Sequence, residues 1–99
     1  MLTIVKELLA KRIAINDEDD YNIEKSRERL IELLSKNETE TISILNQLSE
    51  MEIMYVSEVF EEIAYNLQSE KFILCLKEIQ KKYENIDIED AIEVAEEYI

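Results

Sequence analysis

The chain contains neither glycine nor proline among its 99 residues. An all-β fold needs such residues at its many tight turns, because glycine supplies the positive φ angles of two-residue hairpins. The same absence excludes the glycine-rich loops that bind phosphates and dinucleotides. Many of the residues that remain, such as Glu, Leu, Lys and Ala, favour helices. The sequence therefore predicts an all-α protein.

Apolar residues recur at three- and four-residue spacing along nearly the whole chain, which is the pattern of amphipathic helices. This pattern predicts a single helical domain over residues 1–99, with about six short antiparallel helices. The helices are expected at residues 3–15, 23–36, 40–48, 50–67, 70–83 and 88–98. The residues expected to cap their N-termini are Thr3, Ser49 with Glu52, Ser69 and Asp87. Asn37 suits the C-terminal end of the second helix.

Short connections make consecutive helices antiparallel neighbours, and two architectures satisfy this condition. One is an α–α superhelix of the HEAT-like type, and the other is a compact helical bundle. Ile73 and Leu74 fall off the main apolar stripe of the fifth helix, which indicates that neighbours cover this helix on more than one side. The alternative is an exposed apolar patch that drives homodimerisation, so we expect a monomer or a weak homodimer.

The formal net charge is −13, from 24 acidic and 11 basic residues. Binding to nucleic acid or to an anionic membrane surface requires cationic side chains, so this charge argues against both kinds of partner. No stretch approaches the roughly 20 apolar residues of a membrane span. A basic protein is the complementary partner, and solubility alone is the alternative explanation of the charge.

Side chains that usually carry catalysis are scarce. The chain has no histidine, so no Ser-His or Cys-His pair can form. The single cysteine, Cys75, borders an apolar stripe and is expected to be a small buried hydrophobe rather than a nucleophile. One cysteine cannot form an internal disulfide, which fits the reducing cytoplasm. The sequence thus predicts a cytoplasmic protein that is not an enzyme and needs no cofactor.

Residues 55–65, YVSEVFEEIAY, combine acids and aromatic rings within the fourth predicted helix. On a helical wheel the apolar residues form one face, and a stripe of acids and tyrosines lies opposite to it. This stripe is either an ordinary solvated face or a surface that binds a partner, where tyrosine is a favoured contact residue. The partner-binding residues expected here are Tyr55, Glu58, Glu61, Glu62 and Tyr65.

Two further acidic segments lie outside this helix. The first partly matches a calcium-binding EF-hand loop, but Tyr21 and Asn22 replace a ligand and the required glycine. We therefore expect no metal there, and interpret its four acids either as a solvated loop or as part of the same docking surface. These four acids are Asp17, Glu18, Asp19 and Asp20. The second segment lines the outer side of the last helix with Glu89, Asp90, Glu93, Glu96 and Glu97.

The C-terminal segment, from Ser57 to Ile99, carries three features in series: the helix EVFEEIAYNLQS with its cap, the turn KKYENIDI and the closing helix IEVAEEYI. In these features it resembles the ends of small helical immunity proteins from bacterial polymorphic-toxin and contact-dependent growth inhibition systems. The resemblance implies an acidic cytosolic antitoxin that binds the toxin domain of a neighbouring gene, often a nuclease. It implies no residue roles, because the class has no chemical signature.

Three classes of function follow from these observations. The first is an immunity protein, a toxin inhibitor that docks its acidic, tyrosine-bearing face on a basic toxin domain and blocks the active site. The second is an acidic regulatory module that mimics nucleic acid or antagonises an enzyme. The third is a structural subunit that forms a homodimer through the side bearing Ile73 and Leu74.

Overall fold

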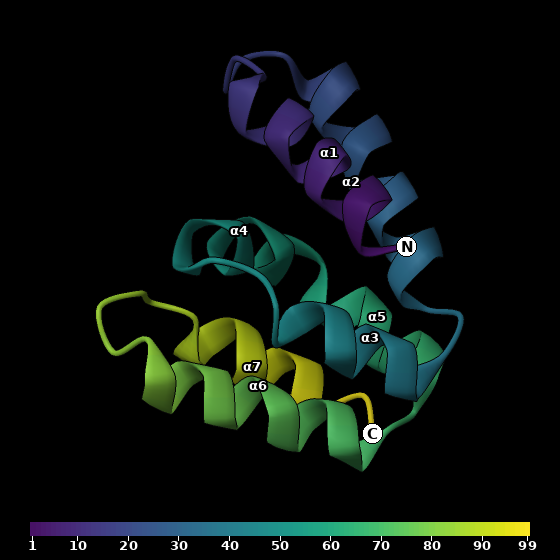
Figure 1. Cartoon of the computed structure of the whole chain (residues 1–99), viewed down its shortest axis with the longest axis vertical. Helices are drawn as coiled ribbons and strands as arrows, with labels where there is room; N and C mark the ends of the chain where they lie inside the picture. Colours follow the sequence, from purple (N-terminus) through teal and green to yellow (C-terminus); the bar gives the residue numbers. More distant parts are fainter.

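Helices form every regular element of the computed structural model, which describes residues 1–99 (Figure 1). The all-α prediction is confirmed. When α4 and α5 are counted as the predicted 50–67 helix, the expected set of about six helices is recovered. In chain order the elements are α1 (Leu2–Ala14), α2 (Asp20–Leu34), α3 (Glu38–Leu45), α4 (Glu50–Val56), the 3₁₀ turn η1 (Ser57–Val59), α5 (Phe60–Leu67), α6 (Glu70–Lys82) and α7 (Glu89–Glu96).

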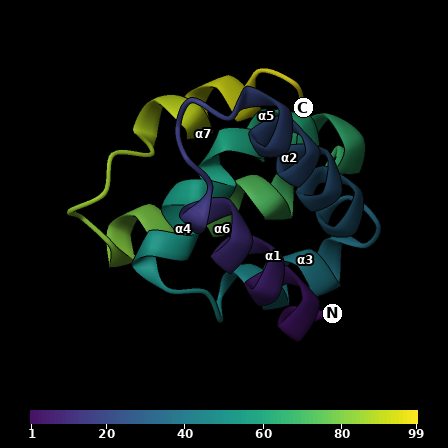
Figure 2. The ribbon, with the colours of Figure 1, turned by 90° about the horizontal axis from the view of Figure 1, so that it is seen from above.

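The α1–α2 hairpin stands at one end of the molecule, and α6 and α7 lie at the other (Figure 1). Seen from above, α1 lies across α4 and α2 lies across α5, and both pairs are in contact (Figure 2). α6 packs against α3, α5 and α7. The principal extents of 32 × 29 × 25 Å are nearly equal, so the fold is the compact bundle of the two expected architectures.

The core forms from the apolar face that the helical wheel assigned to residues 50–67. Ile53, Val56, Phe60 and Ile63 are all fully buried, as predicted. The ring of Phe60 meets that of Phe72 from α6 edge to face, with centroids 6.4 Å apart. This pair fixes α5 against α6 and so positions the outer face of α5.

The two apolar residues that fall off the main stripe of α6 have different surroundings. Ile73 is buried, which confirms that neighbouring helices cover α6 on more than one side. Leu74 is 61% exposed, so that interpretation is wrong for this residue. Its side chain instead lines an open hollow together with residues of α7 and the C-terminal end.

A capping box starts α4. Ser49 Oγ accepts a hydrogen bond from the Glu52 backbone N–H at 3.2 Å, and Glu52 Oε1 accepts one from the Ser49 backbone N–H at 2.8 Å. Glu52 Oε1 also lies 2.8 Å from Lys6 Nζ of α1. The predicted cap is therefore confirmed, and it also links α4 to α1.

Replacing Ser49 by alanine is expected to lower the free energy of unfolding by about 1 kcal/mol, because the Glu52 N–H then loses its acceptor. Urea unfolding followed by circular dichroism measures this loss. Thr3→Ala is the matched control, since Thr3 lies inside α1 and caps nothing. Equal losses in the two variants would contradict the role of the capping box.

Other helix ends agree only in part with the expected caps. Ser69 caps α6 as predicted. Thr3 is wrong as a cap because α1 begins before it, and Asp87 is wrong because Ile88 is the residue that precedes α7. Asn37 does not end the second helix: its Oδ1 accepts from a backbone N–H in the first turn of α3 at 2.9 Å, so it caps the next helix.

The predicted helix over residues 50–67 is interrupted by η1, which separates α4 from α5. Val59 leaves the helical region, with φ −125° and ψ 13°. The prediction of one continuous helix is therefore wrong. The consequence is that Glu58 in η1 meets α1 and α2, whereas α5 packs along α7.

The end of α5 is tied to the end of the chain by Gln68. This residue has φ 48° and ψ 45°, the left-handed conformation in which glycine usually ends a helix. Its side-chain Nε2 donates to the carbonyl oxygens of Tyr65 at 3.0 Å and Tyr98 at 2.6 Å. The Gln68 amide thus holds Tyr98 beside α5, which a glycine at this position could not do.

Candidate functional site

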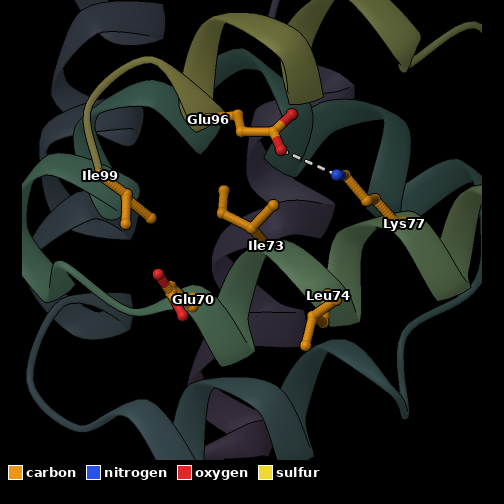
Figure 3. Close-up of a pocket in the computed structure, with 6 residues that line it drawn as sticks. All are labelled: Glu70, Ile73, Leu74, Lys77, Glu96 and Ile99. Atoms are coloured by element: carbon orange, nitrogen blue, oxygen red, sulfur yellow. Dashed lines mark hydrogen bonds and ion pairs between the residues drawn. The ribbon is translucent and has the colours of Figure 1, made fainter.

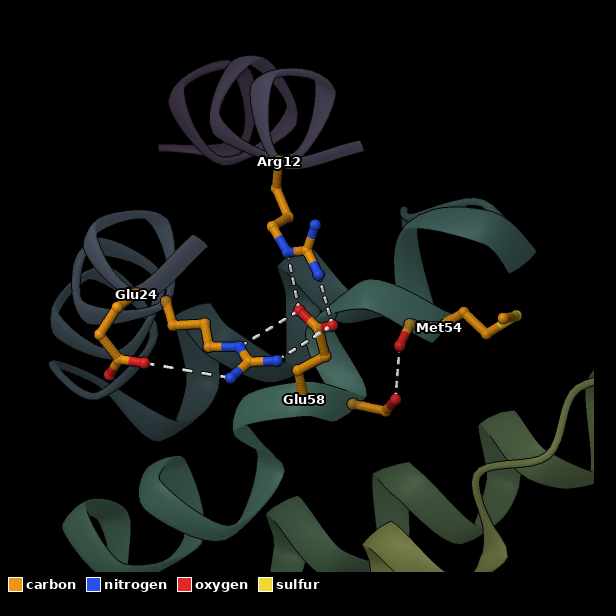
Figure 4. A network of polar contacts seen from close by, with 6 residues as sticks. Arg12, Glu24, Met54 and Glu58 are labelled. Carbon is orange, nitrogen blue, oxygen red and sulfur yellow. Dashed lines mark hydrogen bonds and ion pairs between the residues drawn. The ribbon is translucent and has the colours of Figure 1, made fainter. Parts of the chain in front are cut away.

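Glu58 is held by two arginines of the same chain (Figure 4). Arg12 Nε and Nη2 donate to its two carboxylate oxygens at 2.9 Å and 2.7 Å. Arg27 Nη2 lies 3.3 Å from the same carboxylate. Arg12 is 4% exposed and comes from α1, while Arg27 comes from α2. Glu58 therefore joins the α1–α2 hairpin to the rest of the fold.

The two arginines also control the ionisation of Glu58. Burial alone would raise the pKa of Glu58, but the hydrogen bonds and positive charges of Arg12 and Arg27 together lower the pKa of this carboxyl below its ordinary value. The reciprocal hydrogen bond to Glu58 raises the pKa of Arg12. The Glu58 charge is thus neutralised inside the molecule.

Tyr55 is engaged by the same arginine. The guanidinium carbon of Arg12 lies 5.0 Å from the centroid of the Tyr55 ring, and this ring packs half-buried against the core. The expectation that Tyr55 and Glu58 share one open stripe with Glu62 and Tyr65 is therefore wrong. The interruption at η1 turns the first pair toward α1 and leaves the second pair on α5.

The remaining predicted residues, Glu61, Glu62 and Tyr65, lie on α5 beside the C-terminal end of the chain. Tyr65 is 63% exposed, and its ring meets that of Tyr98 edge to face with centroids 6.1 Å apart. Tyr98 is 41% exposed. Two tyrosines thus stand together at the surface, although the second is not the residue that the helical wheel paired with Tyr65.

Two adjoining hollows flank α5, one against α2 and the C-terminal end of the chain, the other against α7. The first, here named the Tyr65–Tyr98 hollow, has a volume of about 260 Å³ and is lined by Ile31, Glu61, Glu62, Tyr65, Asn66 and Tyr98. The second has a volume of about 210 Å³ and is lined by Ser57, Glu58, Glu61, Asp90, Ala91 and Val94. Glu61 belongs to both. We define the α5–α7 face as Glu61, Glu62, Tyr65, Asp90, Val94 and Tyr98.

The carboxylates of the α5–α7 face have no cationic partner in this chain. None of Glu61, Glu62 and Asp90 lies within ion-pair distance of a lysine or arginine. Glu61 and Glu62 are nevertheless half-buried. A hydrogen-bonding interaction with Glu61, reinforced by its negative charge, raises the pKa of the Tyr98 hydroxyl. A neutral hydroxyl leaves the carboxylate charge in place, so the face presents uncompensated negative charge.

The acidic run of residues 17–20 lies elsewhere, at the tip of the α1–α2 hairpin and far from α7 (Figure 1). Asp19 caps α2, because its Oδ1 accepts from the Asn22 backbone N–H at 3.3 Å, and Asp20 is the first residue of that helix. Asp17 and Glu18 are exposed. No group of three or more acidic, histidine or cysteine side chains is placed to hold a metal ion. The run is therefore separate from the α5–α7 face.

A third hollow lies between α6 and α7 and has a volume of about 360 Å³ (Figure 3). Its apolar wall is formed by Ile73, Leu74 and Ile99. Lys77 Nζ lies 2.8 Å from Glu96 Oε1, so one of its two acids is paired and Glu70 is not. This hollow is larger than the Tyr65–Tyr98 hollow, but it has no aromatic ring in its lining, and it contains a lysine.

Cys75 lies on α6, where its Sγ is 3.8 Å from Asn46 Oδ1. It is buried, and burial raises the pKa of its thiol. A raised pKa keeps the thiol protonated at neutral pH, and the thiolate is the nucleophilic form. The structure therefore confirms the interpretation of Cys75 as a small buried hydrophobe.

No protein family, curated protein or solved structure matches this chain. All helices are too short or too polar to cross a lipid bilayer. The fold and the charge distribution define an all-α bundle in which the α5–α7 face combines unpaired carboxylates with two exposed tyrosine rings.

Proposed function

We propose that this chain is an immunity protein that binds a cognate bacterial toxin domain in the cytoplasm and covers the basic active-site surface of that domain with the α5–α7 face. A nuclease is the favoured kind of toxin, because nuclease active sites carry cations for phosphate binding. The observation that supports the proposal most is that the half-buried residues Glu61 and Glu62, whose carboxylates have no cationic partner, lie beside the exposed Tyr65–Tyr98 pair.

Electrostatics gives this face its proposed role. Glu61 and Glu62 bring two negative charges to the lining of one hollow, and partial burial strengthens electrostatic interactions there relative to water. A cationic partner would be attracted across the interface, where close charge pairs are coupled by about 1.5–7 kcal/mol. The net charge of −13 adds long-range attraction toward a basic surface. The face therefore attracts a basic partner both at long range and at contact.

The tyrosines supply the apolar part of the contact. Tyrosine is enriched at the hot spots of interfaces, because a large ring with few rotatable bonds buries much area at low entropic cost. Tyr65 and Tyr98 support each other edge to face, and the Gln68 side chain holds the Tyr98 backbone. Both rings are thus ordered before a partner arrives.

The proposal is tested by titrating the purified chain with the toxin domain that the adjacent gene encodes. We expect a dissociation constant near nanomolar and an association rate constant of about 10⁸ M⁻¹s⁻¹ at low salt. The association rate should fall steeply at higher salt, since the Debye length is about 8 Å at physiological ionic strength. No binding, or a rate that salt does not change, would contradict the proposal.

A homodimeric subunit is the second candidate, and the exposed apolar residues of the α6–α7 hollow favour it. Leu74 is 61% exposed and Ile99 is 39% exposed. Sedimentation velocity over a range of concentrations tests this candidate. A concentration-dependent dimer that Leu74→Asp abolishes would support it, and a monomer at every concentration would remove it.

A further inference from the structure

The Tyr65–Tyr98 hollow is lined by two kinds of side chain, acidic and apolar or aromatic. Glu61 and Glu62 supply negative charge, whereas Tyr65, Tyr98 and Ile31 supply ring faces and apolar surface. The hollow also contains the Asn66 side chain, whose Nδ2 donates to Ser35 Oγ at 3.0 Å. A ligand that suits this hollow must carry positive charge and must also pack flat against aromatic rings.

No side chain of the same chain fills this role. The lining residues include no lysine or arginine. In contrast, two half-buried glutamates of α4 and η1 each contact a cation: Glu52 lies 2.8 Å from Lys6, and Glu58 lies 2.7 Å from Arg12. Around Glu58 the carboxylate, a tyrosine ring and an arginine come together, whereas in the hollow half-buried glutamates and tyrosine rings meet without a cation.

The arrangement around Glu58 indicates which cation is suitable. There, one arginine forms a two-pronged pair with a carboxylate and lies over a tyrosine ring at the same time. Guanidinium can do both, because it is planar, stacks on rings and donates in a fork that matches a carboxylate. A lysine ammonium is a compact, strongly hydrated charge: it can lie over a ring, as Lys82 does over Tyr83, but it cannot form the fork and stack its plane on a ring at the same time.

We propose that the Tyr65–Tyr98 hollow receives one arginine side chain of the partner protein. The arginine pairs with the Glu61 and Glu62 carboxylates and stacks on the exposed ring of Tyr65. This inference rests on the proposed function, because it specifies the chemistry of the same contact surface. It adds that one side chain occupies the hollow, and that the side chain is arginine rather than lysine.

The test uses a small probe and the intact chain. Nα-acetyl-arginine methylamide is titrated into the protein, and backbone amide NMR signals are followed. We expect saturable shifts at residues 61–66 and 98–99, with a dissociation constant of about 1 mM, which suits a probe of this size. The lysine analogue and the neutral citrulline analogue should each bind at least about tenfold more weakly.

Two variants assign the binding to this hollow. Glu61→Gln with Glu62→Gln should abolish saturable binding, and Tyr65→Leu should weaken it about tenfold through loss of the ring. Thermal unfolding verifies that both variants remain folded. Equal affinity for the lysine analogue, or shifts spread evenly over all acidic segments, would overturn the proposal.

The arginine-probe experiment and the toxin-binding experiment can succeed or fail independently of each other. If the toxin domain binds tightly and arginine does not bind in the hollow, the inference fails and the proposed function stands. If the arginine probe binds as expected and no toxin domain binds, the hollow is a guanidinium site and the proposed function fails. A second copy of the chain could cover the hollow instead. In that case the protein should form a concentration-dependent dimer that the probe does not dissociate, and this result would overturn the inference.

Discussion

Replacing Glu58 by alanine is expected to destabilise the fold by about 3 kcal/mol, near the lower end of the range for breaking a buried ion pair. The reason is that Arg12 stays buried without its carboxylate partner, and its Nη1 already has no hydrogen-bond acceptor. Arg27 also loses its contact, so the α1–α2 hairpin is held less firmly. For a chain of this length the melting temperature should fall by roughly 15 °C.

The loss should depend on pH. Because the pKa of Glu58 is lower in the folded state than the ordinary value of 4.5, its ionised form stabilises the fold fully above that value. This contribution disappears as the pH falls below 4.5 and passes through the lower folded pKa. Urea unfolding at several pH values should therefore show the wild-type and Glu58→Ala stabilities converging in acid. Parallel curves would contradict the account.

Glu61→Ala is the matched control for Glu58→Ala. The two glutamates lie three positions apart, but the Glu61 carboxylate has no cationic partner in the fold. Removing it takes away only a surface hydrogen-bonding interaction with the Tyr98 hydroxyl and one unpaired charge, so the stability should change little. A loss comparable to that of Glu58→Ala would show that Glu61 is structural and would weaken the case for the α5–α7 face.

Reversing the charges of Glu61 and Glu62 to lysine is expected to lower the affinity for the basic toxin domain by at least about 1,000-fold, since like-charge contacts across an interface cost several kcal/mol. Both the association rate and the lifetime of the complex should decrease, because the residues lie next to the proposed aromatic anchors rather than at a distant rim. Surface plasmon resonance at several salt concentrations measures both rates.

The matched control reverses two acids at the tip of the α1–α2 hairpin, with Asp17→Lys and Glu18→Lys. This variant changes the net charge by the same amount, but it lies far from α7 (Figure 1). We expect an affinity loss of less than about tenfold, from weaker long-range attraction only. If the tip variant loses more affinity than the α5 variant, the docking surface is the hairpin tip, which was the alternative interpretation of this acidic run.

The fold was largely predictable because local rules set most of it. The absence of glycine and proline, the apolar spacing and the Ser49 and Ser69 caps identified the helices. The interruption at η1 was not predictable, because Val56, Val59, Phe60 and Ile63 keep the spacing of a continuous helix and all are buried. The contact that η1 makes with α1 is also distant in sequence, because Glu58 and Arg12 are 46 residues apart.

Only the part of the candidate site that lies on α5 was predictable from the sequence. The composition of residues 55–65 indicated an acidic surface with tyrosines, and Glu61, Glu62 and Tyr65 do lie at the surface of α5. The second ring was missed, because Tyr98 reaches Tyr65 through tertiary packing that a helical wheel cannot represent. Tyr55 and Glu58 were misplaced for the same reason, since both contact Arg12, which comes from another helix.

The most direct measurement of the central claim is a backbone amide NMR footprint of this chain in complex with the toxin domain from the adjacent gene. We expect the largest changes in α5, in α7 and at Tyr98, with little change at residues 17–20 and at Leu74. A footprint centred on the hairpin tip or on the α6–α7 hollow, with the amides of Glu61, Glu62 and Tyr98 unchanged, would contradict it.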